Sequence, residues 1–300
     1  MTALYAGIEA GGTKFNVVIG SGPGDIRAEV RLPTMAPGPT LAAVVAFLDD
    51  WPRRGGAPLQ AIGIACFGPL DLRPGSATWG HIADTPKPGW AGVDIAGVFR
   101  QRYQVPVGLD TDVNGAGLGE YRWGAGAGCG VFVYLTVGTG IGGALIVDGK
   151  PLHGLVHPEM GHVRLPHDRG LDPFPGSCPV HADCLQGLAS GRALEQRWGR
   201  PAAELPAEHP GWDLEADYLA QFCANLVLVG SPERIILGGG VMEQAHLLPR
   251  IRAGLRRHLA GYVRPLRLPS ELDAYLVAPG LGSRSGTLGA LCLAERAAAG

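Results

Sequence analysis

The rest of the chain is organised around the stretch Leu109-Asp110-Thr111-Asp112-Val113-Asn114-Gly115-Ala116. An apolar run over residues 105–109 precedes it, and apolar residues at helical spacing follow it. This change of pattern puts Asp112 at the carboxyl end of a strand, at a strand-to-helix turn, where α/β folds place their binding residues.

Two glycine–threonine loops, at residues 11–14 and 138–143, flank Asp112 in the sequence. A carboxylate between two loops of the phosphate-binding type predicts phosphoryl transfer, with Asp112 as the catalytic base that takes a proton from an acceptor hydroxyl. The alternative is that Asp112 only caps the following helix, which is a common role for Asp at such a turn.

Composition restricts the class of protein. The chain has 300 residues, 46% hydrophobic and 17% charged, with a net charge of −2, which favours a soluble globular protein and no nucleic-acid partner. The start lacks a basic segment of the secretory type. Four of the six cysteines are scattered through apolar contexts, so no disulfide ladder is expected and a reducing cytoplasm is the default. Residues 124–147 carry no charge, but their glycines and β-branched clusters predict two strands and a turn rather than a membrane span.

The order of predicted elements occurs twice along the chain. Three strands come first in each half, and alternating helices and strands follow. The strands expected in the opening of each half are 4–9, 14–20 and 26–32, then 131–135, 144–147 and 162–165. Two such halves predict a cleft between domains, where ligands tend to bind.

The glycine loops are candidates for binding phosphate. In Gly11-Gly12-Thr13-Lys14, backbone N–H groups, a hydroxyl and an ammonium group suit an anion, although a plain glycine hairpin remains the alternative. Residues 138–143 fit a dinucleotide-binding spacing, but a strand follows them instead of a helix, so a second phosphate hairpin fits better. Gly238-Gly239-Gly240 follows an apolar strand and favours either a nucleotide contact or a tight turn.

Cysteines and histidines cluster in a proline- and glycine-rich part of the chain. Cys178, His181 and Cys184 are spaced three residues apart, and His162 lies sixteen residues before the first of them. Two thiolates and two imidazoles form a closed tetrahedral zinc site of the structural kind. The alternative is two core cysteines with surface histidines. Three further histidines are spare candidates, of which the last is expected in solvent: His153, His157 and His167.

These motifs together resemble the ROK family of sugar kinases, whose fold is the actin-like, ribonuclease-H-like duplication, and within it the bacterial fructokinases. The resemblance runs nearly end to end. It rests on residues 7–14, 80–90, 157–162, 178–191 and 235–242. It implies an α/β protein with an N-terminal domain of residues 1–112 plus a C-terminal helix at about 285–300, and a larger domain of residues 113–284 that carries the zinc loop.

The resemblance also implies ATP with Mg²⁺, a structural Zn²⁺, a homodimer and a set of site residues. The residues implied to lie against ATP and its phosphates are Gly11, Gly12, Thr13, Lys14, Thr136, Gly138, Thr139, Gly140, Gly238, Gly239 and Gly240. Those implied to contact the sugar are Gly68, Thr111, Asp112, Asn114, Glu159 and Gln186. His162 is implied to anchor the Glu159 loop to zinc.

Two of these positions depart from the family pattern. Thr111 stands where an Asn commonly precedes the base, and Gln186 stands where a sugar-binding Glu is usual. The resemblance implies ATP-dependent phosphorylation of a hexose, and the two departures affect only the choice of sugar. Fructose, phosphorylated at its 6-hydroxyl, is the first hypothesis. Glucose, mannose or an amino sugar is the second. A non-catalytic sugar sensor is a more remote alternative, and so is a regulator, because the chain begins on its first strand without a helix-turn-helix.

Overall fold

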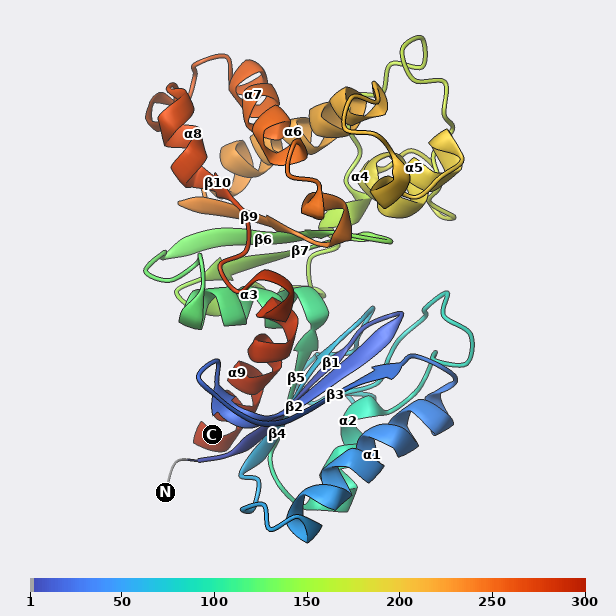
Figure 1. Ribbon diagram of the computed structural model, residues 1–300, viewed down its shortest axis with the longest axis vertical. Coiled ribbons are helices and arrows are strands. Elements are labelled where there is room, and N and C mark those ends of the chain that lie inside the picture. Colours follow the sequence, from blue (N-terminus) through green and yellow to red (C-terminus); the bar gives the residue numbers. More distant parts are fainter. Residues whose placement is uncertain (1–2) are drawn as a thin grey trace. The chain divides into compact units, whose positions relative to one another are not determined.

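The structure is a computed structural model that describes residues 3–300 and divides them into two compact units (Figure 1). Unit 1 comprises the described residues up to Ala127 together with His153–His157 and Arg284–Gly300. Unit 2 comprises Gly128–Leu152 and Pro158–Ser283. The contacts thus divide the chain after residue 127, whereas the domain boundary drawn from the sequence, between residues 112 and 113, stays a prediction.

Unit 1 contains a five-stranded sheet in the order β3-β2-β1-β4-β5. Its strands are β1 (Tyr5–Ala10), β2 (Lys14–Gly22), β3 (Asp25–Pro33), β4 (Ala61–Cys66) and β5 (Val107–Thr111). The first three form an antiparallel meander, and β4 and β5 run parallel to β1. Helices cover both faces of this sheet, α1 (Pro37–Arg53) and α2 (Ile95–Tyr103) on one face, α3 (Asp112–Trp123) and α9 (Ser285–Ala299) on the other (Figure 1).

Strand alternation explains the two faces of the unit 1 sheet. Ile8, Ile62 and Ile64 point to the α1 and α2 side, where they form a core with buried residues of both helices. On the α9 side, Gly7 pairs with Gly63 and Gly63 with Gly108 across three neighbouring parallel strands. A row of glycines therefore lines the surface that α9 covers.

The glycine row lets the backbone of α9 lie directly on the sheet. A Cβ atom added to Gly63 would lie 1.9 Å from the carbonyl oxygen of Ala290, and one on Gly108 would lie 2.3 Å from that of Leu293. Where α9 packs against α3, a Cβ on Gly289 would lie 1.7 Å from the carbonyl oxygen of Gly115. Close backbone approach of this kind is possible only for glycine.

Unit 2 repeats the strand order of unit 1. Its sheet is β10-β9-β6-β7-β8, in which β6, β7 and β8 are antiparallel neighbours and β9 and β10 run parallel to β6. The strands are β6 (Val131–Val137), β7 (Ile141–Val147), β8 (Lys150–Pro151), β9 (Arg234–Gly238) and β10 (Leu276–Val277). The internal duplication expected from the sequence is thus visible in the matching order of the two sheets.

The helices of unit 2 are α4 (Leu185–Ala189), α5 (Gly191–Trp198), α6 (Gly211–Gly230), α7 (Leu247–Leu259) and α8 (Pro269–Tyr275). Helix α6 contributes Trp212, Leu219 and Phe222 to the core beneath β6 and β9. The short helices α4, α5 and α8 lack enough turns to show a clear apolar period in the sequence.

One predicted strand, residues 162–165, is wrong. The structure has a short 3₁₀ helix, η1 (Met160–His162), followed by an isolated bridge between Arg164 and Cys184. Gly161 lies against the sheet, and a Cβ there would be 2.0 Å from the carbonyl oxygen of Ile141. The two-residue β8 takes the third position of the meander, so His162 is left to turn toward the cysteines.

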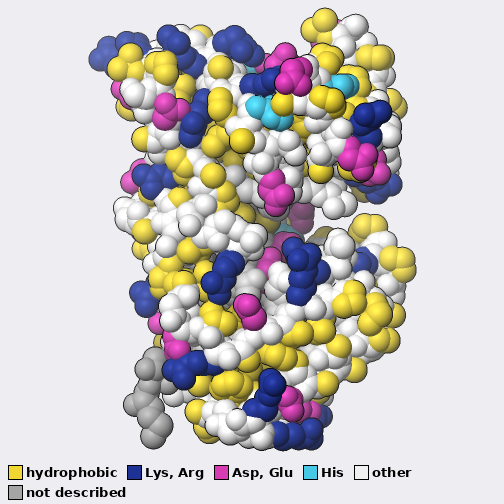
Figure 2. All heavy atoms as spheres, in the orientation of Figure 1, with side chains coloured by type: hydrophobic (Ala, Val, Ile, Leu, Met, Phe, Trp, Pro, Cys, Tyr) yellow, Lys and Arg dark blue, Asp and Glu magenta, His cyan; other side chains and the backbone are white. Residues whose placement is uncertain are grey.

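Charged side chains of both signs are interspersed on the face drawn in Figure 2, with Lys and Arg most dense over α7 and α8. Three of the arginines of α7 form ion pairs with aspartates of neighbouring helices, Arg250 with Asp213, Arg252 with Asp273 and Arg257 with Asp217. Among residues 3–300, no helix is both long enough and apolar enough to cross a membrane.

Gly63→Ala is expected to destabilise the protein by about 1–3 kcal/mol or more, because its methyl group overlaps the backbone of α9. Gly38→Ala in α1 is the control, since an added Cβ there meets no atom within 4 Å. The stability of that control should stay within about 0.5 kcal/mol of wild type, because Gly38 is exposed at the first turn of α1. Urea unfolding of both variants checks the expectation, and equal stabilities would contradict the account of the glycine row.

Candidate functional site

The predicted site residues of unit 1 follow three strands that end at the same level. Ala10 of β1 pairs with Cys66 of β4, and Cys66 pairs with Thr111 of β5. The segments that come next are the loop at 11–14, the loop at 67–70 and the start of α3 at Asp112. They emerge side by side at one carboxyl edge, the place where parallel sheets bind ligands.

At the turn from β5 into α3, neighbouring polar residues make different hydrogen bonds. Thr111 is the N-cap of α3, and its hydroxyl accepts the Asn114 N–H at 3.2 Å. Asp112 is the first helical residue, with Oδ1 2.9 Å from the Val113 N–H. The capping bond is therefore made by Thr111, so the alternative in which Asp112 is itself the cap does not describe this turn. Burial and the nearby Asp112 carboxylate raise the pKa of the Cys66 thiol.

The loop at 11–14 has its carbonyl oxygens engaged by neighbouring groups. Thr34 donates from its hydroxyl to the Gly11 oxygen at 2.7 Å and from its N–H to the Thr13 oxygen at 3.0 Å. The Lys14 oxygen accepts the Gly11 N–H at 3.0 Å. Gly12 and Thr13 are exposed at the tip of the loop. With its acceptors paired, the loop suits an anion better than a cation.

A second segment of unit 1 approaches this loop and was not among the predicted site residues. Trp90 is fully buried, its ring lies 5.6 Å from that of Phe15, and its indole N–H donates to the Met35 oxygen at 3.0 Å. This anchor holds the preceding residues in place, and the Lys87 ammonium group contacts the Gly12 carbonyl oxygen. The scarcity of lysine in the sequence was the available signal for Lys87; nothing in the sequence pointed to Thr34.

In unit 2 the predicted phosphate and nucleotide loops also lie next to each other. Thr136 of β6 pairs with Gly238 of β9, so the loop at 138–140 and the glycines at 239–240 leave neighbouring strands at one edge. Gly239 has a φ of 95°, and a Cβ there would lie 2.5 Å from the Val137 oxygen. Only glycine tolerates that combination.

The predicted sugar contacts are divided between the two units. Gly68, Thr111, Asp112 and Asn114 belong to unit 1, and Glu159 and Gln186 belong to unit 2. Asn114 is 1% exposed, and its Oδ1 is buried without a hydrogen-bond partner among the described residues. Glu159 is exposed at the start of η1. Gln186 accepts the Ile141 N–H at 3.0 Å and so lies against the loop at 138–143.

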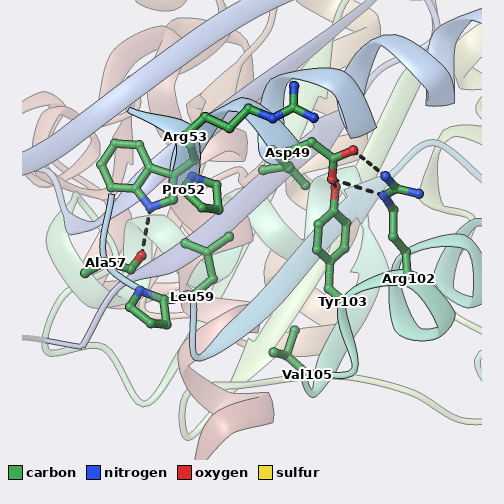
Figure 3. A pocket seen from close by; sticks show the side chains of 11 residues that line it. Asp49, Pro52, Arg53, Ala57, Leu59, Arg102, Tyr103 and Val105 are labelled. Carbon is green, nitrogen blue, oxygen red and sulfur yellow. Dashed lines mark hydrogen bonds and ion pairs between the residues drawn. The ribbon is translucent and has the colours of Figure 1, made fainter. Parts of the chain in front are cut away.

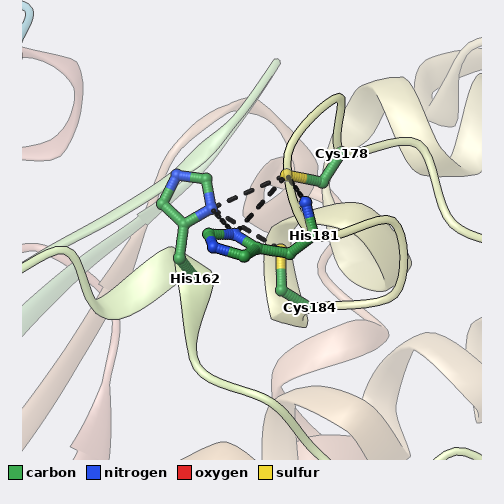
Figure 4. A group of neighbouring side chains, drawn as sticks. All are labelled: His162, Cys178, His181 and Cys184. Carbon is green, nitrogen blue, oxygen red and sulfur yellow. Dashed lines mark hydrogen bonds between the residues drawn. The ribbon is translucent and has the colours of Figure 1, made fainter.

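The four predicted metal ligands converge in unit 2 (Figure 4). The Nδ1 atoms of His162 and His181 are 3.1 Å apart. The Sγ atoms of Cys178 and Cys184 lie 3.7 and 3.6 Å from His162 Nδ1. One potential ligand atom from each of the four residues lies within 4.8 Å of the others.

This donor set fits a zinc ion. A tetrahedral zinc site places neighbouring nitrogens roughly 3.3 Å apart and nitrogen and sulfur roughly 3.6 Å apart, given the usual bond lengths. The observed spacings match that pattern. The His181 N–H donates to Cys178 Sγ at 3.4 Å, which stabilises the sulfur as a thiolate. The group of two histidines and two cysteines therefore suits a structural zinc ion, with all four ligand positions filled by the protein.

A buried polar network supports the loop that carries the cluster. Asp172 is 2% exposed and accepts hydrogen bonds from Arg197 at 3.1 and 3.2 Å and from the Tyr218 hydroxyl at 2.7 Å. His167 contacts the Asp172 carbonyl oxygen at 2.9 Å and the Asp183 carboxylate at 3.4 Å. Its side chain is only 5% exposed, so the expectation that His167 lies in solvent is wrong.

The hollow in Figure 3 lies at the other end of the unit 1 strands. It has a volume of about 740 Å³ and is lined by α1, α2 and the residues that precede β4 and β5. The carboxylate of Asp49 is already engaged by Arg102 and by the Tyr103 hydroxyl at 3.0 Å. None of the predicted site residues lines this hollow.

Comparison with known proteins places this arrangement in a family. The model of the ROK family matches residues 5–297. The chain belongs to the ROK family. This ROK protein is 43% identical over 296 residues to the fructokinase of Zymomonas mobilis, a match that covers 97% of this chain and 96% of the relative. It is 40% identical to the fructokinase of Pediococcus pentosaceus over 98% of each chain.

Solved ROK structures match over nearly the full length. The ROK hexokinase of Thermus thermophilus has a TM-score of 0.79 at 30% identity, with 98% of each chain covered. The ROK glucokinase of Streptomyces griseus, solved with glucose and AMPPNP, has a TM-score of 0.76 at 25% identity over 98% of this chain and 100% of that one. The predicted family and the predicted actin-like α/β fold class are thereby confirmed.

Cys184→Ser is expected to remove bound zinc and to lower Tm by roughly 10 °C or more, because the metal closes a loop that has little core of its own. Cys129→Ser, a buried cysteine outside the cluster, is the control and keeps its zinc. Metal analysis and thermal unfolding of the two purified variants make the comparison. A wild-type protein that is fully folded without zinc would remove the structural role.

Proposed function

We propose that this ROK protein is an ATP-dependent fructokinase that transfers a phosphoryl group to the 6-hydroxyl of fructose. The observation that carries the proposal is the common end of β1, β4 and β5, which brings a glycine loop of the phosphate-binding type and Asp112 to one edge of the sheet. Fructokinases at about 40% identity over nearly the full chain support the choice of sugar.

Asp112 acts as the general base in this proposal. Its carboxylate accepts the proton of the attacking sugar hydroxyl, the oxygen bonds to the terminal phosphorus of ATP, and the bond from that phosphorus to the bridging oxygen breaks to release ADP. Thr111 makes the capping bond and Val113 donates its N–H to one carboxylate oxygen, so the turn fixes the orientation of the base. A fixed orientation lowers the entropic part of the barrier.

The glycine loops bind the phosphates of Mg-ATP. The proposal assigns the donors at Gly12, Thr13 and Lys14, together with Thr136 and the loop around Thr139, to the phosphates. The glycines at 238–240 leave room for the adenosine. Preorganised N–H groups take up the charge that develops on the phosphoryl oxygens without reorganising during the reaction. The nucleotide complex of the Streptomyces griseus relative supports ATP as the donor.

The sugar is bound by Gly68, Asn114 and Glu159. The buried Oδ1 of Asn114 has no hydrogen-bond partner among the described residues. It can accept a hydrogen bond from a sugar hydroxyl, which supports this role because a buried acceptor without a partner is costly. Glu159 lies three residues before the zinc ligand His162, so the metal restricts the loop that carries it. Homodimer formation and a cytoplasmic location complete the proposal by family resemblance.

Thr111 and Gln186, the two departures from the family pattern, each make a structural hydrogen bond that does not depend on one particular sugar. Thr111 caps α3, and Gln186 accepts the Ile141 N–H beside the phosphate hairpin, with an amide group left for a sugar hydroxyl. A ROK kinase for glucose, mannose or an amino sugar is therefore the second candidate. The 28% identity to an N-acetyl-D-glucosamine kinase of Escherichia coli is the observation in its favour.

Asp112→Asn is expected to lower kcat by roughly 10³-fold, because the amide cannot accept the hydroxyl proton. Fructose binding by calorimetry should change by less than about threefold, since the amide keeps the size and one acceptor of the carboxylate. Asp50→Asn on α1 is the control, and its kcat should equal that of the wild type. Near-normal turnover of the Asp112 variant would exclude Asp112 as the base.

ADP release with Mg-ATP, measured for fructose, glucose, mannose and N-acetyl sugars, tests the choice of substrate. A kcat/KM for fructose that exceeds every other value by roughly tenfold or more, which is about 1.4 kcal/mol of transition-state binding, is the expected result. A higher value for another hexose would replace fructose while keeping the kinase. No ADP with any sugar would refute the kinase proposal and favour the sensor.

A further inference from the structure

The carboxylate of Asp110 lies two residues before the proposed base and uses both of its oxygens. Its Oδ1 accepts the Thr111 N–H and the side-chain amide of Asn114, each at 2.7 Å. Its Oδ2 lies 2.9 Å from Nε2 of His153. Asp110 is 6% exposed, so its charge is largely removed from water and needs these partners.

His153 reaches Asp110 from a distant part of the sequence. It opens the short segment 153–157, which belongs to unit 1 although the chain on both sides of it belongs to unit 2. His157 closes the same segment; it is buried, and its Nε2 accepts the Leu70 N–H at 3.2 Å. The segment is thus fixed at the ends of both β4 and β5, and the chain continues from it to Glu159.

The charge on His153 complements the buried carboxylate. The hydrogen bond to Asp110 raises the pKa of the His153 imidazole above its usual value, against the opposing effect of desolvation. The imidazolium form therefore persists closer to neutral pH than in a free histidine. A buried carboxylate with a hydrogen-bonded cationic partner holds its position better than one whose oxygens find no donor.

We propose that His153 is a positioning residue for the reaction: it holds Asp110, and through Thr111 and Asn114 it fixes the β5–α3 turn that carries Asp112. The inference rests on the proposed function, because it assigns a role relative to that base. His153 touches neither sugar nor nucleotide in this account. Its loss lets Asp110 and the first turn of α3 shift, and a displacement of about 1 Å at a base can lower the rate by roughly 100-fold.

The kinetic test compares three variants with fructose and Mg-ATP. His153→Ala should lower kcat by roughly tenfold or more, with the KM for ATP within about twofold of wild type. His153→Gln should recover much of the rate, because its amide can still donate to Asp110. His258→Ala is the matched control, since His258 faces Asp217 at the same kind of distance, 2.8 Å, in unit 2. Its kcat should not change.

A second measurement tests the pair without any reliance on catalysis. Titration of the His153 ring by NMR should give a lower pKa in Asp110→Asn than in wild type, because the Asp110 carboxylate is the partner that raises it. Urea unfolding of Asp110→Asn, His153→Ala and the double variant should show losses that are not additive. An unchanged pKa with additive losses would overturn the pairing.

The outcomes separate the inference from the proposed function. If the wild type phosphorylates fructose and His153→Ala keeps its kcat, the positioning role is wrong and the kinase proposal stands. Equal losses in His153→Ala and His153→Gln, with KM for ATP raised in parallel, would indicate general damage and also overturn the positioning role. If the wild type releases no ADP with any sugar, the proposed function fails and the positioning role fails with it, whatever the NMR titration says of the pair.

Discussion

The contact between α9 and the glycine row of the unit 1 sheet is the constraint on which the rest of this unit depends. Gly7, Gly63 and Gly108 are neighbours across three parallel strands, and the backbone of α9 lies against them. α9 (Ser285–Ala299) is distant in sequence from the strands that it covers, so unit 1 is complete only when this helix packs on the sheet. The same helix supports α3 through Gly289 and Gly115, and α3 begins with the proposed base.

Unit 2 has the same strand order as unit 1, but different interactions stabilise it. Its meander ends in the two-residue β8, and the polypeptide then forms a long loop with little regular structure. Two devices stabilise this loop: the histidine and cysteine cluster at its rim and the buried network around Asp172 beneath it. In the same interior, burial raises the pKa of Glu215 well above its usual range, against the opposing charge of Arg197. A metal ion at the cluster, together with the network, would replace the core that the loop cannot form.

Local patterns in the sequence were enough to predict the duplicated strand order, the strand-to-helix turn at Asp112 and the convergence of the four histidine and cysteine side chains. Each of these depends on residues close in sequence, or on a spacing that has few chemical uses. Residues 162–165 were misassigned as a strand because Gly161 packs against the backbone of Ile141. The alternation of apolar and polar residues cannot reveal such a contact. Thr34 and Lys87 were not among the predicted site residues, and His153 was considered only as a spare metal ligand, because their contacts with the site come from segments distant in the sequence.

The turn at residues 110–114 shows that an Asp at a strand-to-helix turn cannot be assigned a role from the sequence motif alone. An Asp at the start of a helix is usually explained by capping, yet here three neighbouring acceptors perform three different tasks. Thr111 makes the capping bond to Asn114, and Asp110 is buried and held by donors from the turn itself and by His153. Since Thr111 already makes the capping bond, the contribution of Asp112 to the stability of α3 is limited to its charge in the first turn and its bond to the Val113 N–H. The argument for a chemical role at Asp112 therefore rests on what its neighbours do as much as on its own carboxylate.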